Sequence, residues 1–211
     1  MSTLTIVGAG GLGREVAAAA RAMGRTVATF LVEPGYATGP LDGVPVREDE
    51  EAWVEPGPFV LAVGDGAIRK RLARRLAGRD FAAIVHPMAH VGERVEIGRG
   101  AMILGPASIT VDARIGNHAL INPGCTIAHD CTVERFASLS PGVNLAGKVH
   151  VGVGAFVGVG ASVLPARRIG AGATVGAGAV VCEDVPAGVT VAGVPARELR
   201  RDPTAEATLG G

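Results

Sequence analysis

A histidine followed by an aspartate, His129-Asp130, is the pair of residues in this chain best suited to acid–base chemistry. Imidazole gains and loses a proton near neutral pH, so a histidine can take the proton of an attacking amine or hydroxyl group. A neighbouring carboxylate orients the ring and stabilises the imidazolium. We therefore predict that His129 is a general base and Asp130 its partner. For Asp130 the alternative is an ion pair with Lys148, which the repeat described below places one coil above it.

A glycine-rich segment near the N-terminus has the spacing of a phosphate-binding turn. Residues 8–13 read GAGGLG, between an apolar segment and an alanine-rich one, and the next apolar segment ends in an acidic residue. This is the pattern of dinucleotide-binding folds, in which backbone N–H groups at a helix N-terminus attract phosphate. It favours a phosphate-bearing ligand such as a nucleotide sugar, with a purely structural turn and NAD as alternatives. The expected ligand-binding residues are Gly10, Gly11, Leu12, Gly13, Val32 and Glu33.

The remaining reactive side chains have simpler interpretations. A catalytic zinc site needs about three convergent protein ligands, whereas the closest pair among the five histidines is His86 and His90, so we predict no metal. The three cysteines occupy positions of small core residues. The basic cluster at residues 69–75 is predicted to be a solvated helix face, with a phosphate contact by Arg69 as the alternative.

An unbroken six-residue repeat must position His129. Every sixth residue from Val91 to Val181 is aliphatic, and the fifth residue of each hexad is Ala, Val or Cys except at Arg167. A helix has a period of about 3.6 residues, so this hexad period indicates short strands joined by turns, with three hexads in each triangular coil. Residues 91–186 then form about five stacked coils, roughly 25 Å tall at the usual strand spacing.

This register places His129 in a turn, pointing outward, while the aliphatic residue of each hexad points inward. Gly147 lies one coil above His129. The missing side chain there is expected to open a channel, in which the N–H of Gly147 can donate to a developing oxyanion. An ordinary turn glycine is the alternative.

The segment 1–85 has a different organisation. Apolar segments at 3–7, 26–32, 59–63 and 81–85 alternate with helical segments at 14–23 and 67–77. Strands that alternate with helices predict a parallel α/β sheet. We therefore expect a Rossmann-like acceptor-binding domain at 1–85, a β-helix at 86–200 and a disordered tail at 201–211. Only half of a full dinucleotide fold fits into the first part, which argues against NAD.

Composition limits the class of protein. Hydrophobic residues make up 48% of the chain but aromatic residues only 3%, which excludes a disordered chain and favours a narrow aliphatic core. Lys+Arg and Asp+Glu both number 20, so nothing indicates nucleic-acid binding. We see neither a secretory signal nor an apolar run of membrane-spanning length. The odd number of cysteines is typical of a reducing compartment, so we expect a cytoplasmic protein without a membrane partner.

The repeat resembles the left-handed parallel β-helix of hexapeptide-repeat acyltransferases. Together with GAGGLGREV, HPMAHVG, INPGCTIAHDCTV and VAGVPARELR, it resembles one subfamily of these enzymes over about residues 3–200. That subfamily contains sialic acid O-acetyltransferases and the N-acetyltransferases of nucleotide-linked 4-amino sugars such as bacillosamine and perosamine. The resemblance implies a homotrimer with its site between two prisms, acetyl-CoA as acyl donor, and direct transfer without a covalent enzyme intermediate.

The resemblance also assigns roles to individual positions. Asn122 matches an asparagine that precedes the catalytic histidine of these enzymes by the same spacing. Leu12 replaces their loop histidine, and Val32-Glu33 replaces a pair of acidic residues. Four positions match coenzyme contacts: Ser138 (a histidine in the family), Gly147, Val159 and Ala177. Arg197 is expected to be a further contact, with the phosphates of the coenzyme.

The expected activity is therefore acetylation of the amino group of a nucleotide-linked 4-amino sugar. O-acetylation of sialic acid and acetylation of another small amine are the alternatives within the same class. A ligand-binding or scaffold trimer without catalysis is the alternative from another class, and the two departures at Leu12 and Ser138 argue for it.

Overall fold

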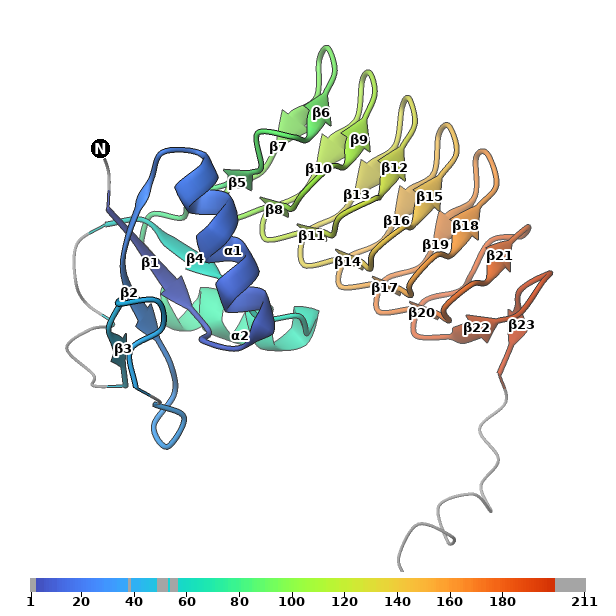
Figure 1. The fold of residues 1–211 in the computed structure, drawn as a ribbon. Coiled ribbons are helices and arrows are strands. Elements are labelled where there is room, and N and C mark those ends of the chain that lie inside the picture. Colours follow the sequence, from blue (N-terminus) through green and yellow to red (C-terminus); the bar gives the residue numbers. More distant parts are fainter. Residues whose placement is uncertain (1–2, 38, 49–52, 54–56, 200–211) are drawn as a thin grey trace, which may run out of the picture.

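The computed structural model describes residues 3–37, 39–48, 53 and 57–199. An N-terminal α/β unit is followed by a long parallel β-helix that carries the rest of the described chain (Figure 1). The expected tail at 201–211 lies outside the described residues. Among these residues no helix is long and apolar enough to cross a membrane.

The α/β unit contains a four-stranded parallel sheet in the order β3-β2-β1-β4. Its strands are β1 (Thr3–Val7), β2 (Thr26–Leu31), β3 (Val46–Arg47) and β4 (Phe59–Leu61), and its helices are α1 (Gly11–Ala22) and α2 (Gly66–Arg75). The predicted α/β character is confirmed, with element ends that differ by a few residues. The short edge strand β3 was not expected, because so short a segment carries no periodic signal.

Glycine is required at two positions of the turn between β1 and α1. Gly8 has a φ of +110°, and a Cβ atom there would lie 2.6 Å from the carbonyl oxygen of Ala62. A Cβ atom on Gly13 would collide with the carbonyl oxygen of Gly8. Only glycine avoids both the positive φ and these close approaches, so this turn is tight for steric reasons.

The β-helix has three faces, which are sheets of eight, six and five strands. Partner strands are three hexads apart in the sequence, as in Thr126↔Asn144 and Ile127↔Leu145, which confirms the predicted coil. The eight-stranded sheet contains β5 (Ile84–Val85), β8 (Met102–Ile103), β11 (Leu120–Ile121), β14 (Ser138–Leu139), β17 (Phe156–Val157), β20 (Thr174–Val175), β22 (Thr190–Ala192) and the antiparallel β23 (Arg197–Glu198).

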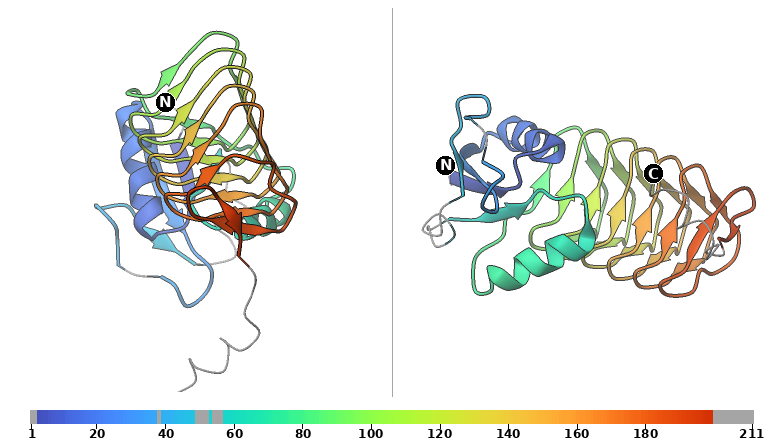
Figure 2. Two further views of the ribbon diagram at one scale, coloured as in Figure 1. Left: turned by 90° about the vertical axis from the view of Figure 1, so that its right-hand side faces the viewer. Right: turned by 90° about the horizontal axis from the view of Figure 1, so that it is seen from below.

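The other two sheets complete each coil. The six-stranded sheet contains β6 (His90–Val91), β9 (Ser108–Ile109), β12 (Thr126–Ile127), β15 (Asn144–Leu145), β18 (Ser162–Val163) and β21 (Val180–Val181). The five-stranded sheet contains β7 (Glu96–Ile97), β10 (Arg114–Ile115), β13 (Thr132–Val133), β16 (His150–Val151) and β19 (Arg168–Ile169). Figure 2 shows the coils nearly end on, with the α/β unit beside the prism.

The core of the prism consists of the inward aliphatic ladder and the small corner residues, as predicted. Ile127 is completely buried between Ile109 and Leu145 of the adjacent coils. Cys125 and Cys131 are buried corner residues. Burial raises the pKa of the Cys125 thiol to about 11, which keeps it protonated and unreactive at neutral pH.

The prediction that segment 81–85 is the last strand of the α/β sheet is wrong. Only Ile84–Val85 is a strand, and it pairs with β8 of the β-helix, whereas Phe81 makes a single bridge to Phe59. Val85 continues the hexad register one step before Val91. The β-helix therefore begins at residue 84. The apolar segment 81–85 reads as one strand in the sequence, although Phe81 contacts β4 of the α/β unit and Ile84–Val85 pairs with the β-helix.

Arg69 connects the two parts and is a second correction. Its side chain is fully buried, although the basic cluster was predicted to be a solvated face. The guanidinium donates to the carbonyl oxygens of Val63 and Gly64 at 2.8 Å, and across the junction to backbone oxygens of the β-helix and to the Ser138 hydroxyl. Burial lowers the pKa of Arg69 to about 10, so it remains a cation at neutral pH, compensated by these oxygens.

His118 lies beside this junction and is also buried. Its ring packs edge-on against Phe81, with centroids 4.6 Å apart, and is stacked with Phe136 at 5.2 Å. Its Nδ1 atom has no hydrogen-bond partner among the described residues. Burial, with the charges of Arg69 and Arg99, lowers the pKa of His118 to about 4, so the ring is neutral at physiological pH.

Candidate active site

His129 and Asp130 occupy the turn that joins β12 to β13, at the corner between the six-stranded and five-stranded sheets. The His129 Nδ1 and Asp130 Oδ2 atoms are 2.7 Å apart, and both side chains are about half exposed, at 56% and 49%. An ionised carboxylate only accepts hydrogen bonds, so this contact places the proton of the neutral ring on Nδ1. The lone pair of Nε2 is then available to accept a proton.

The backbone favours this arrangement. Asp130 has a φ of +60°, in the left-handed region that aspartate tolerates better than most residues. Its carboxylate pairs with the ring of His129, whereas Lys148, the alternative partner, uses its backbone N–H to bond the His129 carbonyl oxygen at 2.9 Å. Among the described residues, the side-chain partner of Asp130 is therefore His129 and not Lys148.

Gly147 provides the space that the imidazole ring occupies. A Cβ atom at residue 147 would lie 2.5 Å from the Nε2 atom of His129, so any side chain there would displace the ring. The sequence predicted an open channel above His129. The structure shows that this space accommodates the imidazole ring of His129 itself, next to the backbone of the following coil.

Three other predicted residues lie at a different corner. Asn122, Val159 and Ala177 belong to turns that connect the eight-stranded sheet to the six-stranded sheet. The amide of Asn122 donates to the carbonyl oxygen of Leu139 at 2.8 Å, while Val159 is 55% exposed and Ala177 is exposed. Within one chain this corner and the His129 corner lie at opposite edges of the six-stranded sheet, so these residues and His129 do not form a single cluster.

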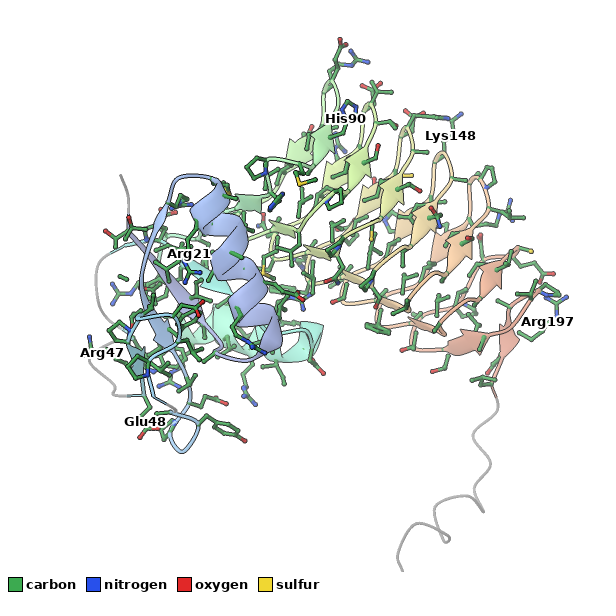
Figure 3. The ribbon with its side chains drawn as sticks, viewed as in Figure 1. Arg21, Arg47, Glu48, His90, Lys148 and Arg197 are labelled. Atoms are coloured by element: carbon green, nitrogen blue, oxygen red, sulfur yellow. The ribbon has the colours of Figure 1, made fainter. Side chains whose placement is uncertain are left out.

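Ser138 is a correction among the predicted coenzyme contacts. Its side chain is 3% exposed. The hydroxyl accepts from Arg69 at 2.9 Å and donates to the Gly64 carbonyl oxygen at 3.2 Å. This residue therefore belongs to the junction between the α/β unit and the β-helix, and its hydroxyl is not available to a ligand. Arg197, another expected coenzyme contact, is exposed near the end of the β-helix (Figure 3).

A cavity of about 480 Å³ lies in the α/β unit at the carboxyl ends of β1, β2 and β4. In open α/β sheets, ligands bind at this edge, where the strand order changes direction. Of the predicted residues, Gly10, Val32 and Glu33 line the cavity. Its other lining residues are Val7, Gly8, Ala9, Leu31, Tyr36, Val63, Ile68, Arg71 and Leu72.

The other three glycine-turn predictions are placed differently. Gly11, Leu12 and Gly13 are not among the residues that line the cavity. They form the first turn of α1, where backbone N–H groups have no partner within the helix. The Leu12 side chain packs against the hydrophobic core of the α/β unit. Any contact that these three residues make with a phosphate therefore involves their backbone.

Arg71 is a charged cavity residue that the sequence analysis did not predict as ligand-binding. Its Nη2 atom lies 3.1 and 3.0 Å from the two carboxylate oxygens of Glu33. Ile68, Arg71 and Leu72 are three and four positions apart on α2, so they share one face of the helix. The sequence shows this spacing. It does not show that this face of α2 and the end of β2 line the same cavity.

Metal binding has no candidate site among the described residues, since they contain no group of three or more His, Cys, Asp or Glu side chains that could hold an ion.

His150 and Glu134 form a second histidine–carboxylate contact, with 3.3 Å between Nε2 and Oε1. Here the carboxylate contacts Nε2, and the His150 side chain is 29% exposed. His129 is therefore the better-placed base.

An α/β unit joined to a left-handed parallel β-helix of hexapeptide repeats, with a histidine–aspartate pair at one corner, defines an acyltransferase class. A family model described as "PglD N-terminal domain" matches residues 3–76. UDP-N-acetylbacillosamine N-acetyltransferase of Bacillus subtilis (strain 168) is 39% identical over 112 residues, which are 49% of this chain and 52% of that protein. The match thus spans about half the length of that curated relative.

Solved structures match nearly the whole chain. A variant of perosamine N-acetyltransferase from Caulobacter crescentus, in complex with CoA and GDP-perosamine, is 36% identical with a TM-score of 0.90, covering 95% of this chain and 98% of that one. The acetyltransferase domain of PglB from Neisseria gonorrhoeae is 32% identical with a TM-score of 0.88, covering 94% and 100%. This chain belongs to the hexapeptide-repeat sugar acetyltransferase family that contains these proteins.

Proposed function

We propose that this protein transfers the acetyl group of acetyl-CoA to the amino group of a nucleotide-linked 4-amino sugar. The observation that carries the proposal is the His129–Asp130 contact of 2.7 Å, which leaves Nε2 of an exposed histidine free to act as a base. The cavity at the carboxyl end of the α/β sheet supports a nucleotide-bearing acceptor. The perosamine N-acetyltransferase variant described above is in complex with CoA and GDP-perosamine, which agrees with both ligands.

The reaction is a direct transfer. The amine nitrogen attacks the thioester carbonyl carbon while Nε2 of His129 takes a proton from that nitrogen. Asp130 accepts the Nδ1–H hydrogen bond, which holds the ring and stabilises the imidazolium. When the carbon–sulfur bond breaks, the imidazolium returns the proton to the CoA sulfur, so the products are the amide and CoA. The backbone N–H of Gly147, directly above the ring, is our candidate donor to the developing oxyanion.

We further propose a homotrimer in which the active site lies between two chains. Within one chain, α2 and the α/β unit adjoin the eight-stranded sheet through Arg69 and Ser138, whereas the His129 turn is at the opposite corner of the prism. Lys148, which follows Gly147 at that corner, points away from the α/β unit in Figure 3. A neighbouring copy can place its acceptor cavity and its Asn122–Val159–Ala177 corner near this histidine, with acetyl-CoA between the prisms.

The reaction also fits a cytoplasmic setting. All three cysteines are free, which is typical of a reducing compartment. The two departures that favoured a scaffold have structural explanations, because Ser138 binds Arg69 and Leu12 packs against the hydrophobic core. The catalytic proposal is therefore preferred over a scaffold.

The test is release of CoA thiol from acetyl-CoA in the presence of nucleotide-linked 4-amino sugars, with sialic acid and a free amino sugar as comparison acceptors. We expect turnover with a nucleotide-linked amine and at most slow turnover with the others. Fastest turnover with sialic acid would change the proposal to O-acetylation. No turnover with any acceptor, by a folded protein that binds acetyl-CoA, would support the scaffold alternative.

A further inference from the structure

The acceptor cavity has an edge in which a carboxylate and a guanidinium lie side by side. Glu33 lies just beyond the end of β2 and Arg71 projects from α2, and both line the cavity. The two side chains are in contact through a single nitrogen, Nη2 of Arg71, which lies 3.0 Å from Oε2 and 3.1 Å from Oε1 of Glu33. The walls next to this pair are apolar, with Val32, Ile68 and Leu72 among their residues.

These features suit the flat ring of a nucleobase. Apolar walls accept the faces of the ring, and the charged pair can bind its polar edge. The turn after β1 also lines the cavity, through Gly8, Ala9 and Gly10. It leads directly into the N-terminus of α1, where phosphates are favoured. The base is then expected next to Glu33 and Arg71, with the phosphates next to Gly10.

The chemistry of the pair selects among the bases. An ionised carboxylate offers two adjacent acceptors and no donor, so it matches a base edge that presents two adjacent N–H donors. Guanine is the one common base with such an edge, formed by N1–H and the N2 amino group. Uracil, adenine and cytosine each present one donor next to an acceptor, and that acceptor would face a carboxylate oxygen. Guanidinium groups bind guanine O6 and N7 well, and O6 lies directly beside N1–H.

We infer that Glu33 and Arg71 make this protein selective for an acceptor linked to a guanine nucleotide over one linked to a uracil nucleotide. Glu33 accepts from N1–H and N2–H, and Arg71 donates to O6. Both side chains are partly exposed, at 43% and 62%, so water competes with these bonds and the expected selectivity is modest. The inference rests on the proposed function, because it assumes that the cavity holds the nucleotide of the acceptor.

Calorimetric binding of GDP, UDP and IDP to the intact protein tests the inference. The base of IDP is hypoxanthine, which retains N1–H and O6 but lacks the N2 amino group. We expect GDP to bind roughly tenfold more tightly than UDP, and several-fold more tightly than IDP, as for hydrogen bonds to a charged acceptor. UDP binding equal to or tighter than GDP would overturn the inference while leaving a nucleotide site in place. If no nucleotide binds, the nucleotide part of the proposed function fails.

Variants separate the two side chains. Glu33→Gln replaces one acceptor by a donor, so it should remove the preference for GDP over IDP. Arg71→Met should weaken GDP and IDP about equally, since both carry O6, and leave the GDP-to-IDP ratio unchanged. Arg74→Met is the matched control, because Arg74 is exposed on the same helix but does not line the cavity. An unchanged GDP-to-IDP ratio in a folded Glu33→Gln protein would show that Glu33 does not bind the base.

Discussion

Mixing two inactive variants tests whether the active site is shared between chains. His129→Ala removes the proposed base. Gly10→Val adds a side chain at the edge of the acceptor cavity, where a Cβ atom meets no other atom within 4 Å, so the protein should fold while acceptor binding is blocked. Each variant alone should have little activity at an acceptor concentration well below KM. Neither change lies in the hydrophobic core of the prism, so both chains should assemble together.

The expected recovery follows from the positions of the two sites. If each site combines His129 of one chain with the cavity of its neighbour, a site is active only when a Gly10→Val chain, which has the histidine, faces a His129→Ala chain, which has the cavity. Random mixing in equal amounts makes this true for about one quarter of the sites in a cyclic trimer. If each site lies within one chain, no mixed trimer gains an active site.

The assay is thiol release after the two variants are unfolded together and refolded, or after they are co-expressed. Each variant treated in the same way by itself is the control for leakage. Recovery near one quarter of the wild-type rate supports the shared site. Recovery at the level of the separate variants, from particles that size measurement shows to be mixed trimers, would refute the reasoning from the opposite corners of the prism.

Three further predictions concern single residues. His129→Ala should lower kcat by roughly 10²–10⁴ with little loss of stability, and a wild-type kcat in this variant would exclude His129 as the base. Asp130→Asn should lower kcat by less, but it should move the acidic limb of the pH–rate profile. Ile127→Asp places an unpaired charge in the prism core and should prevent folding, so a soluble, folded variant would contradict the register. His118 is neutral in the folded protein, with a pKa of about 4, and takes up a proton when the protein unfolds. The free energy of unfolding, measured by urea titration, should therefore fall by about 2 kcal/mol from pH 7 to pH 5. An equal fall in a His118→Phe variant would contradict this.

The sequence by itself determined the β-helix, its register and the place of the His129–Asp130 pair. A six-residue period specifies which residues point inward because each strand and turn repeats locally, and Ile127 is buried as that register requires. His129 and Asp130 are adjacent in the chain, so their contact needs no long-range information. The glycine pattern likewise indicated the β1–α1 turn, because the positive φ of Gly8 and the close approach of Gly13 to the Gly8 carbonyl oxygen arise within the turn itself. The close approach of Gly8 to Ala62, the residue after β4, is a tertiary contact.

Only the tertiary structure decided how the two parts meet. Arg69 appeared to belong to a solvated basic face, but it is buried because oxygen atoms from segments as far away as residue 138 surround it. The same contact removes Ser138 from the expected coenzyme site. Likewise, Glu33 and Arg71 are 38 residues apart, and their contact depends on how α2 packs beside β2. Such contacts join distant segments, so they leave no periodic signal in the sequence.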